Sequence, residues 1–139
     1  MKNDLNIGER IEGNSITVSD FHIYSFASLT GDFNPLHVND EFSKKTEFKG
    51  RIAHGLLSLS LALGLISEYF NGYFLYGFDK IRFLNPVKPG TTIHSEISVI
   101  SKKEKENYDL YYCKLELFDQ DKKEILISEI IFGRMKKDE

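Results

Sequence analysis

Residues 52–67 read IAHGLLSLSLALGLIS, sixteen positions without an aspartate, glutamate, lysine or arginine. A membrane-spanning helix takes about 20 predominantly apolar residues. This stretch is shorter, carries three serines and a histidine, and is followed directly by Glu68. Its apolar residues cover nearly all sides of a helix, which is typical of a helix enclosed by other structure. We therefore expect a buried core helix that stops at Asn71-Gly72, and no membrane partner.

Shorter helical pieces are predicted on the amino-terminal side of this helix. Ser19 is a suitable N-cap for a helix that Gly31 ends in the left-handed conformation. Asn39 predicts a second, shorter helical turn directly after it. Between them, the Asn34-Pro35 pair predicts an irregular loop, because proline biases the preceding residue away from the helical region.

The rest of the chain reads as β-strands. Aromatic-rich or alternating apolar residues predict strands over 73–84, 92–100, 108–118 and 124–132. The charged stretch 102–106 predicts a solvated hairpin turn. Short loops between strands favour antiparallel pairing. A sheet packed on one apolar helix is an α+β architecture, with the helix in the concave side of the sheet.

Length, charge and cysteine content bound the class of protein. With 139 residues and 16.0 kDa, we expect a single globular domain over residues 1–139. The 18 basic and 21 acidic residues provide no basic surplus for duplex DNA or RNA, so nucleic acid is not expected as a partner. Cys113 is the single cysteine, and the first twelve residues lack an apolar signal segment. Both features predict a cytoplasmic protein.

Residues 30–37, TGDFNPLH, have unusual local chemistry. Asp32 and His37 lie across the predicted turn, where one water or small substrate could bridge a general acid/base pair. Taken alone, an aspartate here is more often a turn or capping residue, and the histidine more often structural. His37 and His54 flank no cysteine and no helical i, i+4 partner, so a metal site is not predicted.

Gly55 stands at the predicted start of the core helix. Backbone N–H groups there have no intrahelical acceptor, and the helix dipole favours negative charge. Because glycine has no side chain, a carbonyl oxygen that is becoming an oxyanion can approach its amide closely. Close packing of the helix start against another backbone is the alternative reason for a glycine at this position.

Two motifs together, LTGDFNPLHVN at 29–39 and IAHG at 52–55, resemble the hydratase motif of the MaoC-like dehydratases. This family includes the (R)-specific enoyl-CoA hydratases. Weaker similarity at residues 7–8 and 81–90 extends the resemblance through most of the chain. It implies the hot dog fold, in which an antiparallel sheet wraps a long central helix. It also implies homodimers or higher even oligomers, with coenzyme A bound near the subunit interface.

The resemblance also implies roles for individual residues. Asp32 and His37 would be the catalytic dyad, and the Gly55 amide would polarise a thioester carbonyl. Asn34 and His54 complete the predicted oxyanion and substrate-binding set. The implied reaction is the reversible hydration of trans-2-enoyl-CoA to (R)-3-hydroxyacyl-CoA, by a hydro-lyase without a metal or redox cofactor. A hot dog acyl-CoA thioesterase and a non-catalytic acyl-CoA binding module are the alternatives.

One departure from the family pattern concerns a hydroxyl near the dyad. Some relatives have a serine where this chain has Leu63, and Ser58 or Ser60 could replace it, although the chemistry above does not require one. The residues leave open which dyad member is the base, the acyl chain length, the physiological direction, and whether coenzyme A or acyl carrier protein carries the acyl group.

Overall fold

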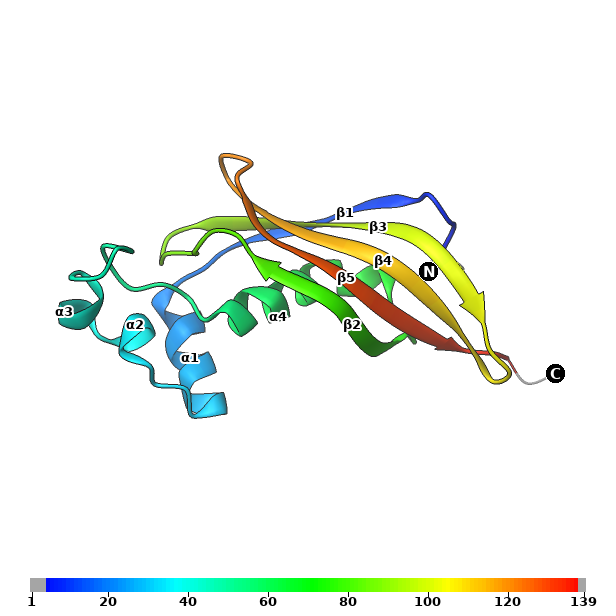
Figure 1. The fold of residues 1–139 in the computed structure, drawn as a ribbon, viewed down its shortest axis with the longest axis horizontal. Helices are drawn as coiled ribbons and strands as arrows, with labels where there is room; N and C mark the ends of the chain where they lie inside the picture. The colour runs from blue at the N-terminus through cyan, green and yellow to red at the C-terminus, as the bar shows by residue number, and fades with distance from the viewer. Residues whose placement is uncertain (1–4, 138–139) are drawn as a thin grey trace.

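The computed structural model describes residues 5–137 as a curved five-stranded sheet with one long helix against its concave face (Figure 1). In chain order the elements are β1 (Arg10–Thr17), α1 (Asp20–Thr30), α2 (Pro35–Val38), α3 (Asp40–Ser43), α4 (Gly55–Ile66), a 3-10 turn (Ser67–Tyr69), β2 (Phe74–Phe83), β3 (Thr92–Glu104), β4 (Tyr108–Asp119) and β5 (Glu124–Met135). The predicted α+β architecture is confirmed. The predicted domain of residues 1–139 extends at both ends beyond the described residues.

The sheet is antiparallel throughout, with strand order β1-β3-β4-β5-β2. Strands β3, β4 and β5 form the meander expected from their short loops. Strand β2 pairs with β5 at the far edge and not with β3, so the expectation that consecutive strands pair is wrong there. The connection 84–91 contains Pro86 and Pro89, which cannot donate to a strand ladder, and it carries the chain across to β3.

Strand β1 is the element that the sequence pattern does not predict. Its apolar alternation breaks where a bulge shifts the register against β3 between Glu12 and Ser15. Gly13 lies in this bulge, and a Cβ added to it would meet both Ile66 Cγ2 and the Leu65 carbonyl oxygen at 2.7 Å. The irregular sequence of β1 therefore has a packing reason, because the backbone of the strand must approach α4 closely.

The two predicted helical pieces before the core helix are confirmed as α1 and α3. Ser19 precedes α1, and Gly31 ends it with φ 81°. Asn39 caps α3, its Oδ1 accepting a hydrogen bond from Phe42 N at 2.9 Å.

Two other segments differ from their predictions. Strand β3 continues through 102–104 in register with β4, so the charged turn is shorter than predicted. Pro35 begins the one-turn helix α2 where a loop was expected, because its fixed φ suits the first helical position. Asn34 stays extended, as expected before a proline, and its Oδ1 accepts from Leu36 N at 3.0 Å.

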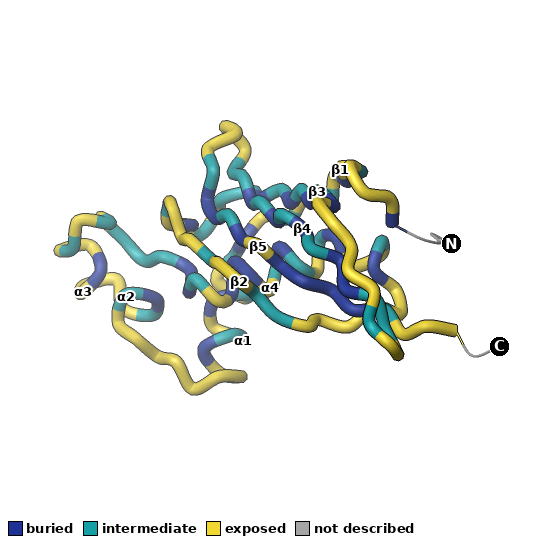
Figure 2. The backbone as a smooth tube through the Cα atoms, turned by 45° about the vertical axis from the view of Figure 1, so that its right-hand side comes forward, coloured by how far each residue is buried: buried dark blue, intermediate teal, exposed yellow. Residues whose placement is uncertain are grey.

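The core lies between α4 and the inward faces of β3, β4 and β5 (Figure 2). Fully buried Ser95 on β3 donates its hydroxyl to the Ala62 carbonyl of α4 at 2.9 Å, which ties the sheet to the helix. Helix α4 is less enclosed than its sequence suggests. Ile66 is fully buried, whereas Leu56 at the other end is 61% exposed.

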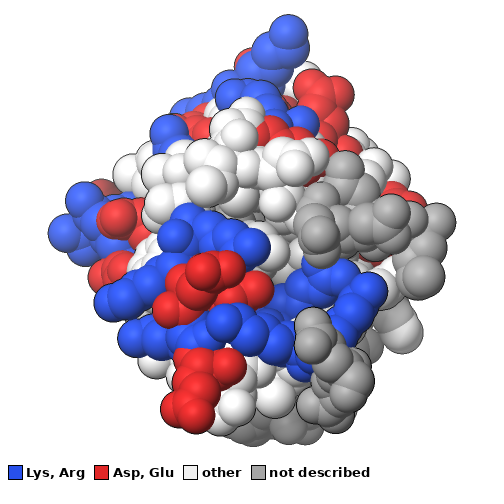
Figure 3. Space-filling view, turned by 90° about the vertical axis from the view of Figure 1, so that its right-hand side faces the viewer, with Lys and Arg blue, Asp and Glu red and all other residues white. Residues whose placement is uncertain are grey.

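Charged side chains of both signs share the end of the molecule shown in Figure 3. Among the ion pairs of the chain, Asp109 near the start of β4 lies 3.8 Å from Lys102 and 3.7 Å from Lys136. The residues described at this end form a mixed surface and not one continuous basic face. Within residues 5–137, no helix combines the length and the apolar character needed to cross a membrane.

Arg51 connects the short helices that gather beside the start of α4 (Figure 1). Its Nε lies 2.7 Å from Asp40 Oδ1 at the start of α3, and its Nη2 lies 2.8 Å from Asp20 Oδ1 at the start of α1. These hydrogen bonds, to Asp40 first, raise the pKa of Arg51. The guanidinium also lies 5.4 Å from the centre of the Tyr24 ring. The planar guanidinium of Arg51 therefore connects the starts of α1 and α3 to the segment that enters the core helix.

We expect Arg51→Lys to lower the free energy of unfolding by about 1 to 2 kcal/mol, because lysine keeps the charge but loses the planar fork that reaches two carboxylates. Urea denaturation measures this change as a lower midpoint. The matched control is Lys44→Met, which removes an exposed pair with Glu41 (N–O distance 3.0 Å) and should cost less than about 0.5 kcal/mol. Equal losses in both variants would contradict the role given to Arg51.

Candidate active site

Two backbone segments meet where α2 lies beside the chain that enters α4. Ile52 N donates to the Leu36 carbonyl at 3.1 Å, and Ala53 N donates to the Val87 carbonyl at 2.7 Å. The two sequence motifs are therefore hydrogen-bonded to each other, and the second is also anchored to the connection between β2 and β3.

The His37 side chain is oriented by the same segment. Its Nδ1 lies 2.8 Å from the Ile52 carbonyl oxygen. A carbonyl oxygen only accepts hydrogen bonds, so Nδ1 carries the hydrogen and Nε2 of the neutral ring keeps its lone pair. The backbone thus selects the tautomer in which His37 can accept a proton at Nε2.

Burial lowers the pKa of His37, and the neighbouring His54 imidazole lowers it further. The hydrogen bond to the Ile52 carbonyl and the charge of Asp32 act in the opposite direction without reversing the shift. His37 is therefore held in its neutral form at neutral pH, which is the form that acts as a base.

His54 brings Asp32 into the same cluster. Its Nε2 lies 3.0 Å from the backbone carbonyl oxygen of Asp32. Its ring stacks on His37, with centroids 3.9 Å apart and planes inclined by 29°. The Phe26 ring of α1 lies 4.9 Å from the His54 ring. Asp32, His37 and His54, which the sequence analysis singled out, are thus brought together by the fold.

Asp32 lies in an exposed turn that local hydrogen bonds shape. Its N–H donates to Thr30 Oγ1 at 3.2 Å, and its Oδ1 accepts from Asn34 N at 3.2 Å. The Asn34 side-chain oxygen is engaged in capping α2, so what the structure shows for Asn34 is a turn-forming role. Its predicted part in substrate binding stays a prediction.

The three side chains are close enough together to be considered as ligands of a metal ion. One potential ligand atom from each of Asp32, His37 and His54 lies within 4.8 Å of the others. An imidazole binds a metal in its ring plane at about 2 Å. The His37 and His54 rings are stacked and inclined by only 29°, so their planes meet much farther than about 2 Å from either ring. One metal ion therefore cannot lie in both ring planes at bonding distance. The geometry of this pair therefore does not favour chelation, and the expectation that no metal is needed stays a prediction.

A cavity of about 340 Å³ begins at this cluster. His37 and Gly55 line it, and so does the buried hydroxyl residue Ser58. Most of its walls are apolar, including Phe48, Ile52, Phe83, Leu84, Val87 and Ile125. Asp32 does not line the cavity in the single chain. Of the two serines considered from the sequence, Ser58 faces the cavity, whereas Ser60 is exposed and donates to the Leu56 carbonyl.

Gly55 is the first residue of α4, so its N–H has no acceptor within the helix. It lines the cavity next to the dipole-positive end of that helix. A Cβ added to Gly55 would meet the Phe83 ring at 3.1 Å. The close packing anticipated as an alternative is therefore real, although the neighbour is a side chain and not another backbone.

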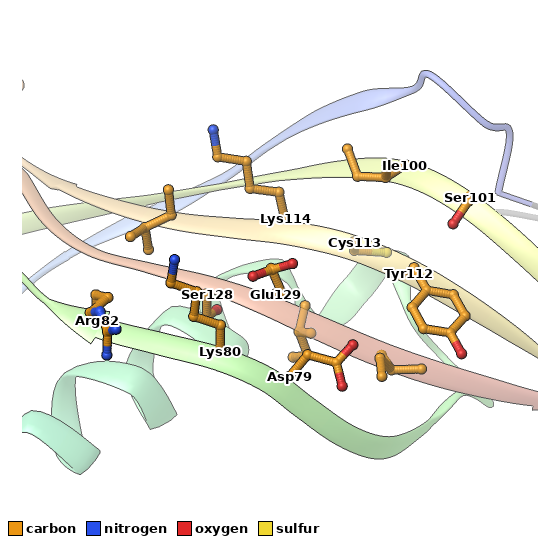
Figure 4. A pocket seen from close by; sticks show the side chains of 13 residues that line it. Asp79, Lys80, Arg82, Ile100, Ser101, Tyr112, Cys113, Lys114, Ser128 and Glu129 are labelled. Atoms are coloured by element: carbon orange, nitrogen blue, oxygen red, sulfur yellow. The ribbon is translucent and has the colours of Figure 1, made fainter.

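A larger cavity, of about 520 Å³, lies on the outer face of the sheet (Figure 4). Glu129 of β5 pairs in register with Lys80 of β2 and Lys114 of β4, and all three line this cavity. It contains neither His37 nor Gly55. The smaller cavity is the candidate active site, because it is lined by His37, the predicted acid/base residue, and by Gly55, whose N–H has no acceptor within α4.

Sequence reasoning missed Arg51 as an organiser of the site and left Ser58 undecided. The available signal for Arg51 was its position directly before the IAHG motif, with acidic residues at the starts of both predicted short helices. Nothing in the spacing showed that one guanidinium would reach both carboxylates, since they are separated along the chain by the loop that carries Asp32.

Known proteins resemble this chain in sequence. A family model described as the MaoC like domain matches residues 2–115. An (R)-specific enoyl-CoA hydratase of Rhodospirillum rubrum is 37% identical over 84 residues, which cover 60% of this chain and 58% of that protein. An (R)-specific enoyl-CoA hydratase of Aeromonas caviae is 35% identical over 83 residues, 59% of this chain and 62% of that protein. The matches thus span about three fifths of these relatives.

Solved structures extend the likeness to the whole fold. A monoamine oxidase regulatory protein from Archaeoglobus superposes with a TM-score of 0.90 and 36% identity, covering 96% of this chain and 93% of that one. The (R)-hydratase of Aeromonas caviae superposes with a TM-score of 0.81 and 27% identity, covering 92% and 96%. Together with the family match over most of the sequence, these findings confirm the resemblance: the chain belongs to the MaoC-like domain family and has the hot dog fold.

Proposed function

We propose that this chain catalyses the reversible hydration of trans-2-enoyl-CoA to (R)-3-hydroxyacyl-CoA. The observation that carries the proposal is the meeting of His37 and Gly55 in one cavity, with the Asp32 carboxylate beside the imidazole. The relatives from Rhodospirillum rubrum and Aeromonas caviae, both (R)-specific enoyl-CoA hydratases, support the same reaction.

The first requirement of this reaction is polarisation of the thioester carbonyl. Conjugation makes C3 of the enoyl group electrophilic only when electron density can move to the carbonyl oxygen. In the proposal, the N–H of Gly55, which has no acceptor within the helix, and the positive end of α4 stabilise the oxyanion that forms there. The apolar walls of the cavity suit an acyl chain and strengthen these electrostatic interactions by excluding water.

The second requirement is a water molecule activated at C3. In the proposal Asp32 and His37 hold this water between them, and Nε2 of neutral His37 takes its proton. The hydroxyl bonds to C3, the π electrons move toward the carbonyl oxygen, and C2 receives a proton from the acid/base pair as the enolate collapses. The net change is addition of one water, so proton transfer and an oxyanion site suffice and no redox or metal cofactor takes part.

We also propose that the working unit is a homodimer paired along β2. This strand forms one edge of the sheet and exposes large apolar side chains, which include Phe74, Leu75, Tyr76 and Phe83. A long apolar edge strand left unpaired is an aggregation hazard, and pairing with a second copy removes it.

Loss of either dyad residue should abolish most of the activity while leaving the fold intact. Asp32→Asn and His37→Ala should each lower hydration of crotonyl-CoA by about 10² to 10⁴ fold, the usual range for one acid/base group. The double variant should lose little more, because both residues act on one water. His94→Ala, on the outer side of the sheet, and Asp121→Asn, in the exposed turn between β4 and β5, are the matched controls and should keep full activity.

Following enoyl absorbance and free thiol together separates the proposal from its alternatives. Loss of enoyl without thiol indicates a hydratase, and release of thiol indicates a thioesterase. A chain that binds enoyl-CoA of several lengths but changes neither signal is a binding module. Near-normal turnover by a folded Asp32 or His37 variant would refute the dyad.

The Gly55 amide can be removed without removing the helix. Proline suits the first helical position, and His54 already has the extended backbone, φ −58° and ψ 138°, that a following proline requires. Gly55→Pro should lower turnover by roughly 10² to 10³ fold through loss of one oxyanion donor. Gly55→Ala adds a Cβ near Phe83 but keeps the N–H, so it should lose much less. Equal activity of the two folded variants would place the oxyanion elsewhere.

The proposed dimer predicts a molar mass of at least twice 16.0 kDa in light scattering. A charge on the paired edge should be costly to bury, so Tyr76→Lys should shift the mass toward that of the monomer. Ile100→Lys changes an equally exposed apolar residue on the outer face and should leave the mass unchanged. A wild-type chain that is active at monomer mass would rule out this proposal.

A further inference from the structure

We infer that His54 is a positioning residue that holds both Asp32 and His37 through a single imidazole. The inference deepens the proposed function and rests on it, since positioning matters only if these two groups act on substrate. It assigns to His54 a role that differs from the direct substrate contact suggested by the motif.

The first contact of His54 fixes the backbone of Asp32. The hydrogen-bond partner of His54 Nε2 is the Asp32 carbonyl oxygen, 3.0 Å away, so Nε2 must be the donor. The hydrogen bonds described above between Asp32 and its neighbours Thr30 and Asn34 each span two residues and shape only the turn itself. The bond from His54 spans 22 residues and connects that turn to the residue that caps α4.

The second contact of His54 fixes the ring of His37. The stacked imidazole covers one face of His37 at a centroid distance of 3.9 Å, while the Ile52 carbonyl holds Nδ1 of His37. Rotation of His37 about its side-chain bonds would break both contacts. The stack therefore keeps Nε2 of His37 aimed in one direction, which is what general base catalysis requires of its base.

The location of His54 argues against direct contact with a substrate. The residue is 2% exposed and does not line the cavity that His37 and Gly55 share. Its Nδ1 is buried and has no hydrogen-bond partner among the described residues. His54 therefore lies behind Asp32 and His37 and contacts both of them. On its other side, the centre of its ring lies 4.9 Å from the centre of the Phe26 ring.

Three substitutions separate the two contacts. His54→Gln keeps an N–H donor and loses the ring, His54→Phe keeps a ring and loses the donor, and His54→Ala loses both. With crotonyl-CoA we expect His54→Phe to lower kcat by roughly 10- to 100-fold with KM changed by less than about threefold. His54→Gln should retain kcat within about fivefold of wild type, and His54→Ala should be at least as impaired as His54→Phe. His94→Phe, on the outer side of the sheet, should behave as wild type.

The pH profile supplies a readout that a purely structural role would not move. His54 contributes to the lowered pKa of His37, so its removal in either the Gln or the Phe variant should raise that pKa. The acid limb of the kcat profile, where His37 becomes protonated and stops acting as a base, should then move to higher pH in both variants. The plateau should fall much further in the Phe variant than in the Gln variant.

The outcomes that would overturn the inference are specific. Equal kcat in folded Gln and Phe variants would show that the hydrogen bond to Asp32 does not position the carboxylate. A raised KM with unchanged kcat would show direct substrate binding by His54.

An independent measurement keeps this test separate from the proposed function. Nitrogen-15 NMR of the imidazole rings should show His54 as the Nε2–H tautomer and His37 as the Nδ1–H tautomer, and titration in the His54→Phe variant should show a higher His37 pKa. A Nδ1–H tautomer at His54 would refute the inference whatever the activity. Absence of hydration by the wild-type chain, with these tautomers present, would refute the proposed function alone.

Discussion

Burial of the apolar helix α4 in the concave face of the sheet is the constraint on which the rest of the structure depends. The helix has few polar groups of its own, so the sheet supplies the contacts that fix its position, among them the Ser95 hydroxyl on the Ala62 carbonyl. The bulge at Gly13 lets β1 approach Leu65 and Ile66 in the last turn of the same helix within contact distance. Both contacts lie in the second half of α4, and the start of the helix is held separately by the hydrogen bond from Ala53 N to the Val87 carbonyl at 2.7 Å.

The segment that enters α4 positions the residues of the candidate active site. Residues 51–54 contact the earlier part of the chain, residues 20–40, at several points. Arg51, Ile52 and His54 each contact a different part of it. Arg51 binds the starts of α1 and α3, Ile52 accepts from His37, and His54 donates to the carbonyl of Asp32. The contacts that hold Asp32 and His37 therefore depend on the position of one short stretch.

The environment of the candidate site then sets the protonation state of His37, the proposed base. Burial lowers the pKa of His37, and the Ile52 carbonyl selects the Nδ1–H tautomer. The larger cavity on the outer face has more volume, but Glu129 there lies between two lysines in register, and neither His37 nor Gly55 lines it. Volume alone therefore does not select the candidate site, whereas the combination of a neutral imidazole and a helix start favours the smaller cavity.

The sequence by itself determined the elements whose signals are local. The uncharged stretch 52–67 predicted the core helix, Gly31 and Asn39 marked helix ends, and the two motifs at 29–39 and 52–55 named Asp32, His37 and Gly55. Only the tertiary structure decided the pairing of β2 with β5, the presence of β1, and the contacts of Arg51 and His54. Caps, turns and apolar periodicity involve residues a few positions apart, so one segment is enough to predict them. Strand partners, and the carbonyl that a histidine reaches 22 residues away, depend on where the whole chain has packed.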